Sequence, residues 1–216
     1  MAEKLRDILD AVAHGVFPAA DGTVRVVPQP SGRDAGVPAF TAHTVVFTDE
    51  DPARVRRTPA SADCDPPAAS MNVRFLAAFT ERTGRRTDTV DVMTVAEPLP
   101  GGAPPGAVRI DDPGHPRVVS ALERRDEVRV WAVDGGVLVL GRVIAGRLEA
   151  AVEVAEEGAE EARHRGLGRR LALAARRLAG DEPVWAQISP GNARSLRAFQ
   201  AAGYRPVGSQ ALFPRG

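Results

Sequence analysis

The chain has 216 residues, and its 28 basic and 28 acidic side chains give it no net charge at pH 7. Proteins that bind nucleic acid through its phosphates usually carry a basic excess, so the charge balance argues against a nucleic-acid partner. Hydrophobic residues make up 44% of the sequence, which is enough to build a core. No apolar run reaches the roughly 18 residues of a membrane helix. The N-terminal region also lacks the apolar run of a signal peptide, so we expect a cytoplasmic protein without a membrane partner.

Residues that commonly bind metals are few and scattered. Cys64 is the only cysteine, which excludes an internal disulfide and a thiolate cluster. We interpret it as a loop residue, because acidic neighbours disfavour the reactive thiolate. The histidines show no metal-ligand spacing; they are His14, His43, His115 and His164. We therefore expect no metal cofactor.

Residues 1–97 predict an N-terminal α+β region. Apolar residues at helical spacing predict a helix over residues 3–14. The other expected elements are strands at 40–47 and 90–96 and a helix at 71–80. Residues 19–39 are rich in turn formers, and a second loop-like stretch contains the prolines at 52, 59, 66 and 67.

Pro98 to Pro105 form the clearest break in the chain, because prolines and glycines dominate this stretch. We predict a linker at 98–111 and a second domain at 112–216. A long loop within one domain is the alternative.

The second half predicts an α/β fold with a clear order of elements: helix, three-strand meander, helix, strand, helix, strand. The expected ranges are 118–125, 128–133, 137–144, 148–154, 165–179, 184–188, 192–202 and 205–213. The meander should be antiparallel, and the strand-helix-strand passage from 148 to 188 should be a parallel crossover. We thus expect a mixed, mostly antiparallel sheet with helices on both faces.

A glycine-rich segment, Arg163-His164-Arg165-Gly166-Leu167-Gly168-Arg169-Arg170, lies where a strand gives way to a helix. Glycines allow a ligand to approach the backbone closely, and the first amides of a helix are unpaired and lie at the positive end of its dipole. The segment therefore predicts a phosphate or pyrophosphate site. A plain glycine-rich turn with solvated arginines is the alternative.

A second motif, Asn-x-x-Ser-x-x-x-aromatic-x-x-x-Gly-aromatic, spans Asn192 to Tyr204. We expect Tyr204 to belong to the core. Together the two motifs resemble those of the GNAT superfamily of N-acetyltransferases over residues 112–216. The resemblance implies acetyl-CoA as co-substrate. It also implies that the glycine loop holds the pyrophosphate, that the preceding strand offers backbone to the pantetheine arm, and that the asparagine touches this arm. The implied cofactor-binding residues are Val152, Val154, Arg163, Arg165, Gly166, Leu167, Gly168, Arg169 and Asn192.

Two features depart from the family pattern. The family often has a tyrosine seven residues after the asparagine, which protonates the leaving thiolate, whereas this chain has Phe199. Ser195, one helical turn earlier, is our candidate for this acid, and a purely structural serine is the alternative. The acid-rich loop at 155–162 is also longer than usual; it is either solvated or attracts a cationic amine.

Glu149 and Glu153 share one face of the strand at 148–154, which we expect to lie inside the sheet. Carboxylates there need partners or a function, because an unpaired buried charge is unfavourable. Pairing with Arg142 or Arg129 on neighbouring strands is one interpretation. General-base catalysis is the other. We favour Glu153 as the base because it lies nearer the strand end where the thioester is expected.

The resemblance implies transfer of an acetyl group from acetyl-CoA to an amine, either a small molecule or a peptide. A non-catalytic acyl-CoA-binding or regulatory module is the alternative. A nucleotide-binding domain ranks last, because the Walker and Rossmann glycine motifs are absent from the sequence. Residues 1–97 could be a degenerate acetyltransferase half or a cap over the substrate pocket. The sequence is compatible with a homodimer and with a monomer.

Overall fold

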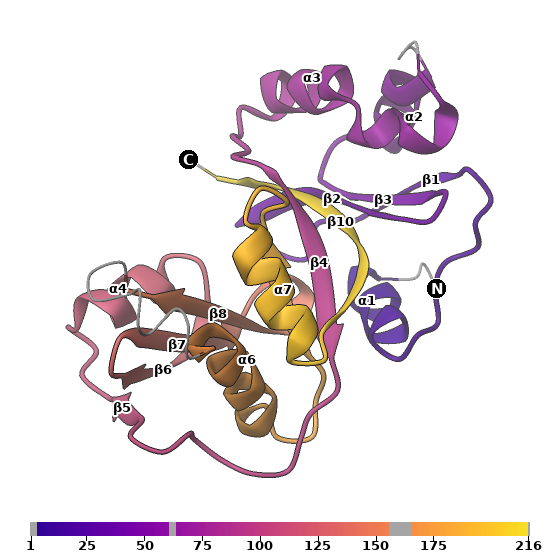
Figure 1. Cartoon of the computed structure of the whole chain (residues 1–216). Coiled ribbons are helices and arrows are strands. Elements are labelled where there is room, and N and C mark those ends of the chain that lie inside the picture. Colours follow the sequence, from indigo (N-terminus) through magenta and orange to yellow (C-terminus); the bar gives the residue numbers. More distant parts are fainter. Residues whose placement is uncertain (1–3, 61–63, 156–165, 216) are drawn as a thin grey trace. The chain divides into compact units, whose positions relative to one another are not determined.

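The computed structural model describes residues 4–60, 64–155 and 166–215 (Figure 1). The chain forms two compact units, one with residues 1–93 and 207–216 and the other with residues 94–206. Residues 98–111 thus belong to the second unit, where Leu99 N donates to Arg176 O at 3.0 Å. That 1–97 and 112–216 are separately folding domains stays a prediction.

The first unit combines helices with a sheet in the order β1-β3-β2-β10. Strand β1 runs parallel to β3, whereas the β2–β3 and β2–β10 pairs are antiparallel. Phe79 and Phe213 form an edge-to-face pair at 4.7 Å in its core, so the last strand of the chain completes this unit. The elements are α1 (Leu5–Ala13), β1 (Val24–Val27), β2 (Asp34–Phe40), β3 (His43–Phe47), α2 (Pro52–Ala60), η1 (Pro66–Met71), α3 (Val73–Thr83), the start of β4 (Val90–Ala96) and the end of β10 (Arg205–Pro214).

The sequence interpretation was wrong for β1, β2 and α2, which lie in stretches expected to be irregular. Gly36 and Pro38, residue types that are common in turns, both lie within β2. A Cβ atom at Gly36 would collide with the ring of Phe47, so packing requires glycine at this strand position. The single strand expected at 40–47 is interrupted by a turn at Ala42, whose φ is +49°.

The second unit contains the sheet order β4-β9-β8-β7-β6-β5. The β5–β6, β6–β7 and β7–β8 pairs are antiparallel, and β8 runs parallel to β9. The mixed, mostly antiparallel sheet, the meander and the parallel crossover are therefore confirmed. The elements are the end of β4, β5 (Val108–Ile110), α4 (Pro116–Leu122), β6 (Asp126–Val133), β7 (Gly136–Arg142), η2 (Ile144–Gly146), β8 (Leu148–Val154), α6 (Leu167–Leu178), β9 (Val184–Ile188), α7 (Ala193–Ala201) and the start of β10.

Helices cover both faces of the sheet in the second unit, as expected. Leu138 and Leu140 of β7 pack in the cluster that contains α6 and α7, and the alternate residue Val139 packs in the cluster that contains α4. Leu148 and Ala150 of β8 face α6 in the same way. The carboxylates of β8 therefore belong to the α4 face.

Asp21 stabilises the turn that leads into β1. Its Oδ1 accepts hydrogen bonds from the hydroxyl of Thr23 at 2.7 Å and from the amide of Thr23 at 3.0 Å, and it lies 3.0 Å from Nδ1 of the buried His43. These contacts, led by the Thr23 hydroxyl, lower the pKa of Asp21 from 3.8 to about 2. The ionised form is thus favoured in the folded state.

Asp21 should contribute stability that is present above pH 3.8 and is lost as the pH falls towards about 2. Asp21→Asn keeps the shape of the side chain and removes the charge, so the variant should lose less stability than the wild type across this window. Urea unfolding followed by circular dichroism at several pH values measures the difference. Asp10→Asn, at an exposed position in α1, is the matched control. If the free energy of unfolding falls equally with pH in the wild type and in Asp21→Asn, Asp21 is not the source of this pH dependence.

Candidate functional site

The start of α6 presents unpaired backbone amides. Gly166 precedes the helix with φ +68° in the left-handed region, which glycine adopts without strain, and its carbonyl accepts the hydrogen bond from Arg170 N at 3.0 Å. Within the described residues, the amides of Leu167, Gly168 and Arg169 have no acceptor. With the positive end of the helix dipole, they can bind an anion. The predicted Arg163 and Arg165 lie outside the described residues.

Gly168 lies between the end of β8 and the helix α7. A Cβ atom placed on it would be 3.6 Å from the Cβ of Ala198 and 3.9 Å from a methyl group of Val154, which are ordinary van der Waals distances. Packing within the described part of the chain therefore does not demand glycine here. The structure brings Val154 and Gly168 together, as the cofactor prediction requires.

The strands β8 and β9 pair over a short distance. The ladder joins Leu148 to Val184 and Glu149 to Trp185, and in these fully described strands no further pair follows. On its other side, β8 pairs with β7 as far as Val154. Among the described residues, the edge of β8 that faces β9 therefore has no strand partner beyond Glu149, and this open edge includes the backbone around the predicted Val152.

Asn192 caps the helix α7. Its side-chain oxygen accepts a hydrogen bond from Ser195 N at 3.1 Å, which satisfies one of the free amides at the helix start. Asn192 is thus the N-cap of α7, and its contact with a cofactor stays a prediction. Ser195 is half-buried on the same helix.

Phe199 and Tyr204 are core residues. Both are buried, and their rings meet edge to face at 4.8 Å. Tyr204, the only tyrosine of the chain, donates its hydroxyl proton to Ala172 O at 3.4 Å, and burial raises its pKa. The core position predicted for Tyr204 is confirmed. A phenol this buried is poorly placed to protonate a leaving thiolate.

Glu149 is buried in a cluster of charged and polar side chains. It accepts hydrogen bonds from Arg125 at 3.1 Å, Arg147 at 3.2 Å and Gln187 at 3.1 Å. Arg147 also stacks on the ring of Trp185, with 5.1 Å between its guanidinium carbon and the ring centroid. Burial lowers the pKa of Arg147, and the charge of Glu149 opposes this effect. The Gln187–Glu149 hydrogen bond joins β9 to β8, and the Arg147–Trp185 contact joins β9 to the turn before β8.

The interpretation that Arg142 or Arg129 pairs with these carboxylates was wrong, because their arginine partners are Arg125, Arg147 and Arg117. Arg142 lies opposite Leu148 in the β7–β8 register, and Arg129 lies opposite Leu140 in the β6–β7 register. Both arginines therefore point to the α6 face, whereas Glu149 points to the other one. Arg125, Arg147 and Gln187 were not predicted as partners of Glu149. The available signal was the two-residue spacing of Arg147 and Glu149, which places both side chains on one face of an extended segment.

Glu153 has a different environment from Glu149. Its side chain is 56% exposed and forms an ion pair with Arg117 of α4, which the sequence analysis also missed. An exposed pair of this kind contributes little to stability and can open readily. Glu153 is therefore the more accessible of the two carboxylates proposed as a base.

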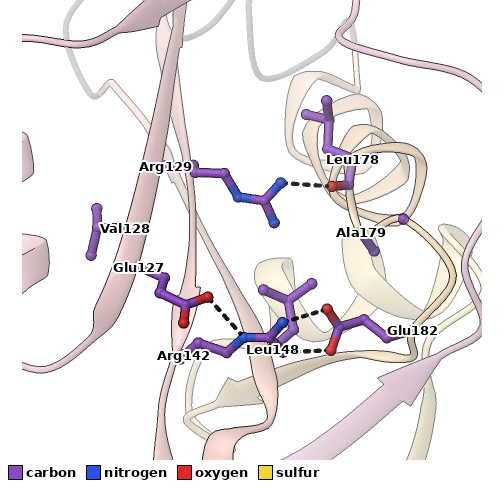
Figure 2. A pocket seen from close by; sticks show the side chains of 9 residues that line it. Glu127, Val128, Arg129, Arg142, Leu148, Leu178, Ala179 and Glu182 are labelled. Carbon is purple, nitrogen blue, oxygen red and sulfur yellow. Dashed lines mark hydrogen bonds and ion pairs between the residues drawn. The ribbon is translucent and has the colours of Figure 1, made fainter.

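A cavity of about 500 Å³ lies at the other end of α6 (Figure 2). Twelve helical residues separate the two ends of α6, which corresponds to about 18 Å at 1.5 Å per residue. No sequence pattern predicts this cavity. In the described part of the chain, no group of three His, Cys, Asp or Glu side chains is arranged to hold a metal ion, and no helix could cross a bilayer.

Comparison with protein-family models and with curated proteins finds no match to this chain. Three solved structures align with part of it. A protein described as a GNAT-family acetyltransferase from Novosphingobium aromaticivorans aligns over 62% of this chain and 68% of its own, at 19% identity and a TM-score of 0.42. GCN5-related N-acetyltransferases from Kribbella flavida (18% identity, TM-score 0.40) and Sphaerobacter thermophilus (14%, 0.38) each align over 65% of this chain. The alignments span 64% and 56% of those two proteins, less than two thirds of each. Overlaps this partial define neither a ligand nor a substrate for this chain.

Glu149→Gln should destabilise the second unit far more than Glu153→Gln. Removing the charge of Glu149 breaks its ion pairs with the buried Arg147 and the half-buried Arg125, and breaking a buried pair typically costs about 3 kcal/mol or more. The exposed Glu153–Arg117 pair should contribute less than about 1 kcal/mol. Both tryptophans of the chain, Trp131 and Trp185, lie in the second unit, so fluorescence-detected urea unfolding measures both losses there. Equal losses would show that Glu149 does not act as a structural ion-pair partner.

Proposed function

We propose that this chain transfers an acetyl group from acetyl-CoA to an amine. The observation that carries the proposal is the set of free amides at Leu167, Gly168 and Arg169 beside the open edge of β8. A CoA thioester is an anion joined to an amide-rich arm. Its pyrophosphate needs hydrogen-bond donors, and the amides of its pantetheine arm need a strand edge with which to pair.

In this proposal the pyrophosphate binds at the start of α6. The free amides donate hydrogen bonds to its oxygens, and the helix dipole favours its negative charge. Gly168 supports this placement, because neighbouring protein atoms do not require glycine there, whereas close approach of a ligand to the backbone does. Arg163 and Arg165 would add charge at the rim.

The pantetheine arm then continues the sheet. Its amides pair with the open edge of β8 around Val152 and Val154, in the space that β9 leaves beyond the last pair of the ladder. Asn192 would contact the arm through its side-chain amide while its oxygen caps α7. This arrangement holds the thioester in place for attack, and proximity supplies much of the rate.

The reaction needs a neutral amine, a base and a proton for the thiolate. The amine nitrogen attacks the thioester carbonyl, the C–N bond forms, and the C–S bond breaks. Glu153 takes the proton from the amine after its ion pair with Arg117 opens. A free amide of the β8 edge stabilises the oxyanion. Glu149 is the weaker candidate for the base because three side chains already occupy its oxygens.

Ser195 or water returns a proton to the CoA thiolate. Phe199 has no proton to give, and the Tyr204 hydroxyl is buried in the core. Ser195 is the polar side chain one turn before Phe199 on α7, half-buried rather than enclosed. The acceptor is an amine of a small molecule or a peptide.

An acyl-CoA-binding module without catalysis is the second candidate. It is favoured by two observations: both carboxylates of β8 are ion-paired, and Phe199 replaces a proton donor. Release of CoA from acetyl-CoA in the presence of an amine panel distinguishes the two functions. Binding without release supports the module.

Gly168→Asp should weaken acetyl-CoA binding while the fold survives. The new carboxylate repels the pyrophosphate, but an acid in the first turn of a helix is compatible with the dipole. Losing charge-assisted hydrogen bonds weakens binding by roughly tenfold to a hundredfold. Titration calorimetry measures the affinity. Gly168→Ala, whose methyl group fits at 3.6 Å from Ala198, is the control for size. Unchanged affinity in Gly168→Asp would rule out this placement.

Glu153→Gln should lower turnover by roughly a hundredfold and leave acetyl-CoA affinity unchanged, because general-base catalysis typically contributes at least this much. Arg117→Gln breaks the same ion pair but keeps the carboxylate, so it should retain activity. Steady-state release of CoA measures both. If the two variants lose activity equally, the ion pair matters and Glu153 is not the base. Ser195→Ala, assayed in parallel over a range of pH, should lose turnover only if Ser195 is the acid.

A further inference from the structure

The cavity beyond the C-terminal end of α6, here called the distal pocket, is built within the second unit. Figure 2 shows side chains from β6, β7, β8 and the end of α6 around it. Its volume is about 500 Å³. The apolar part of the lining comes from Val128, Leu148, Leu178 and Ala179, and Arg129 and Arg142 are its cations.

Arg142 is fully engaged by the protein. Its guanidinium binds both carboxylate oxygens of Glu182, and it also contacts Glu127 at 3.4 Å and the carbonyl of Gly146 at 3.2 Å. Hydrogen bonds to Glu182 raise the pKa of Arg142. This arginine therefore forms one wall of the pocket and has little capacity left for a ligand.

Arg129 is different, because the protein uses only part of its guanidinium. Nη1 donates to the carbonyl of Leu178 at 3.2 Å, and the group lies over the ring of Trp131 at 5.8 Å. Among the described residues, Nε and Nη2 have no acceptor. In Figure 2 the guanidinium extends from β6 across the pocket towards the end of α6.

The charges around Arg129 favour an anion beside it. Burial lowers the pKa of Arg129, and the positive charges of Arg142 and Arg109 lower it further, whereas Glu182 and Glu127 oppose them. A bound anion would offset both burial and repulsion. One free edge of a guanidinium matches one carboxylate, since the two groups form paired hydrogen bonds.

We infer that the distal pocket binds a small monocarboxylate with a short apolar tail, its carboxylate on Nε and Nη2 of Arg129 and its tail on Leu148 and Leu178. A dianion such as phosphate fits less well, because Glu127 and Glu182 also line the pocket. The start of α6 lies about 18 Å away along the helix axis, so this site is separate from the proposed CoA site.

Butyrate is the probe, and butyramide is its neutral counterpart of equal size. Binding is followed by titration calorimetry and by the NMR signal of the arginine Nε–H groups. We expect butyrate to bind the wild type with a roughly millimolar dissociation constant, typical of so small a ligand. Butyramide should bind at least about tenfold more weakly, because it lacks the charge.

Three variants separate a ligand site from a simple cap on α6. Arg129→Gln should abolish butyrate binding. Arg129→Lys keeps the charge and a donor for the Leu178 carbonyl but loses the paired donors, so it should weaken binding. Arg109→Gln, which removes a nearby exposed charge paired with Asp111, should leave binding in place. Far-UV circular dichroism checks that each variant is folded, because the Arg129 variants alter the surroundings of Trp131 directly.

The inference is overturned if the wild type does not bind butyrate at millimolar concentrations, since Arg129 then serves only as a helix cap. It is equally overturned if butyramide binds as well as butyrate, or if folded Arg129→Gln retains the affinity. Inorganic phosphate should not displace butyrate. Tighter binding of phosphate would identify a dianion site instead.

Discussion

The strands β8 and β9 pair at Leu148–Val184 and Glu149–Trp185 and, within these described strands, at no later position. Side chains reinforce this last rung. Gln187 of β9 donates to Glu149 of β8, and Arg147, just before β8, binds Glu149 and stacks on Trp185 of β9. The side-chain contacts of Glu149 and Arg147 thus join the two strands at one end, and beyond them the edge of β8 has no partner in β9.

The open edge gives the proposed site its form. A strand edge inside a sheet normally has a partner, because unpaired backbone groups are unfavourable away from water. Here the free edge continues to Val154, which lies next to Gly168 at the start of α6. One extended ligand could therefore pair with the strand and place a phosphate at the helix. In this account Glu149 joins β8 to β9 at the last pair of the ladder, and Glu153 acts as the base.

Much of the second unit could be predicted from the sequence. The bounds of β4, β8 and β9 match the predicted ranges, because apolar and β-branched runs flanked by turn residues specify them locally. The α6 helix follows from its apolar spacing, and Gly166 directly precedes it. The alternation of β8 also placed both glutamates on one face.

The rest depended on contacts between distant segments. Gly36 and Pro38 made β2 hard to predict, since the reason for a glycine there is its close contact with the ring of Phe47 and the carbonyl of Ala211, which lie in other strands. The partners of Glu149 come from segments far apart in the sequence, since Arg125 precedes β6 and Gln187 belongs to β9. The register of β7 and β8 places Arg142 opposite Leu148, not Glu149. The distal pocket is lined by residues of β6, β7, β8 and the end of α6, and no local sequence pattern predicts that these segments lie around one cavity.

The most direct test of the proposed site is a titration of the isotope-labelled protein with acetyl-CoA, followed through its backbone amide NMR signals. The account predicts large shifts for the amides of Leu167, Gly168 and Arg169 and for the open part of β8. Signals at the distal pocket should change little. If acetyl-CoA binds but leaves the amides at the start of α6 unchanged, or does not bind at all, the account is contradicted.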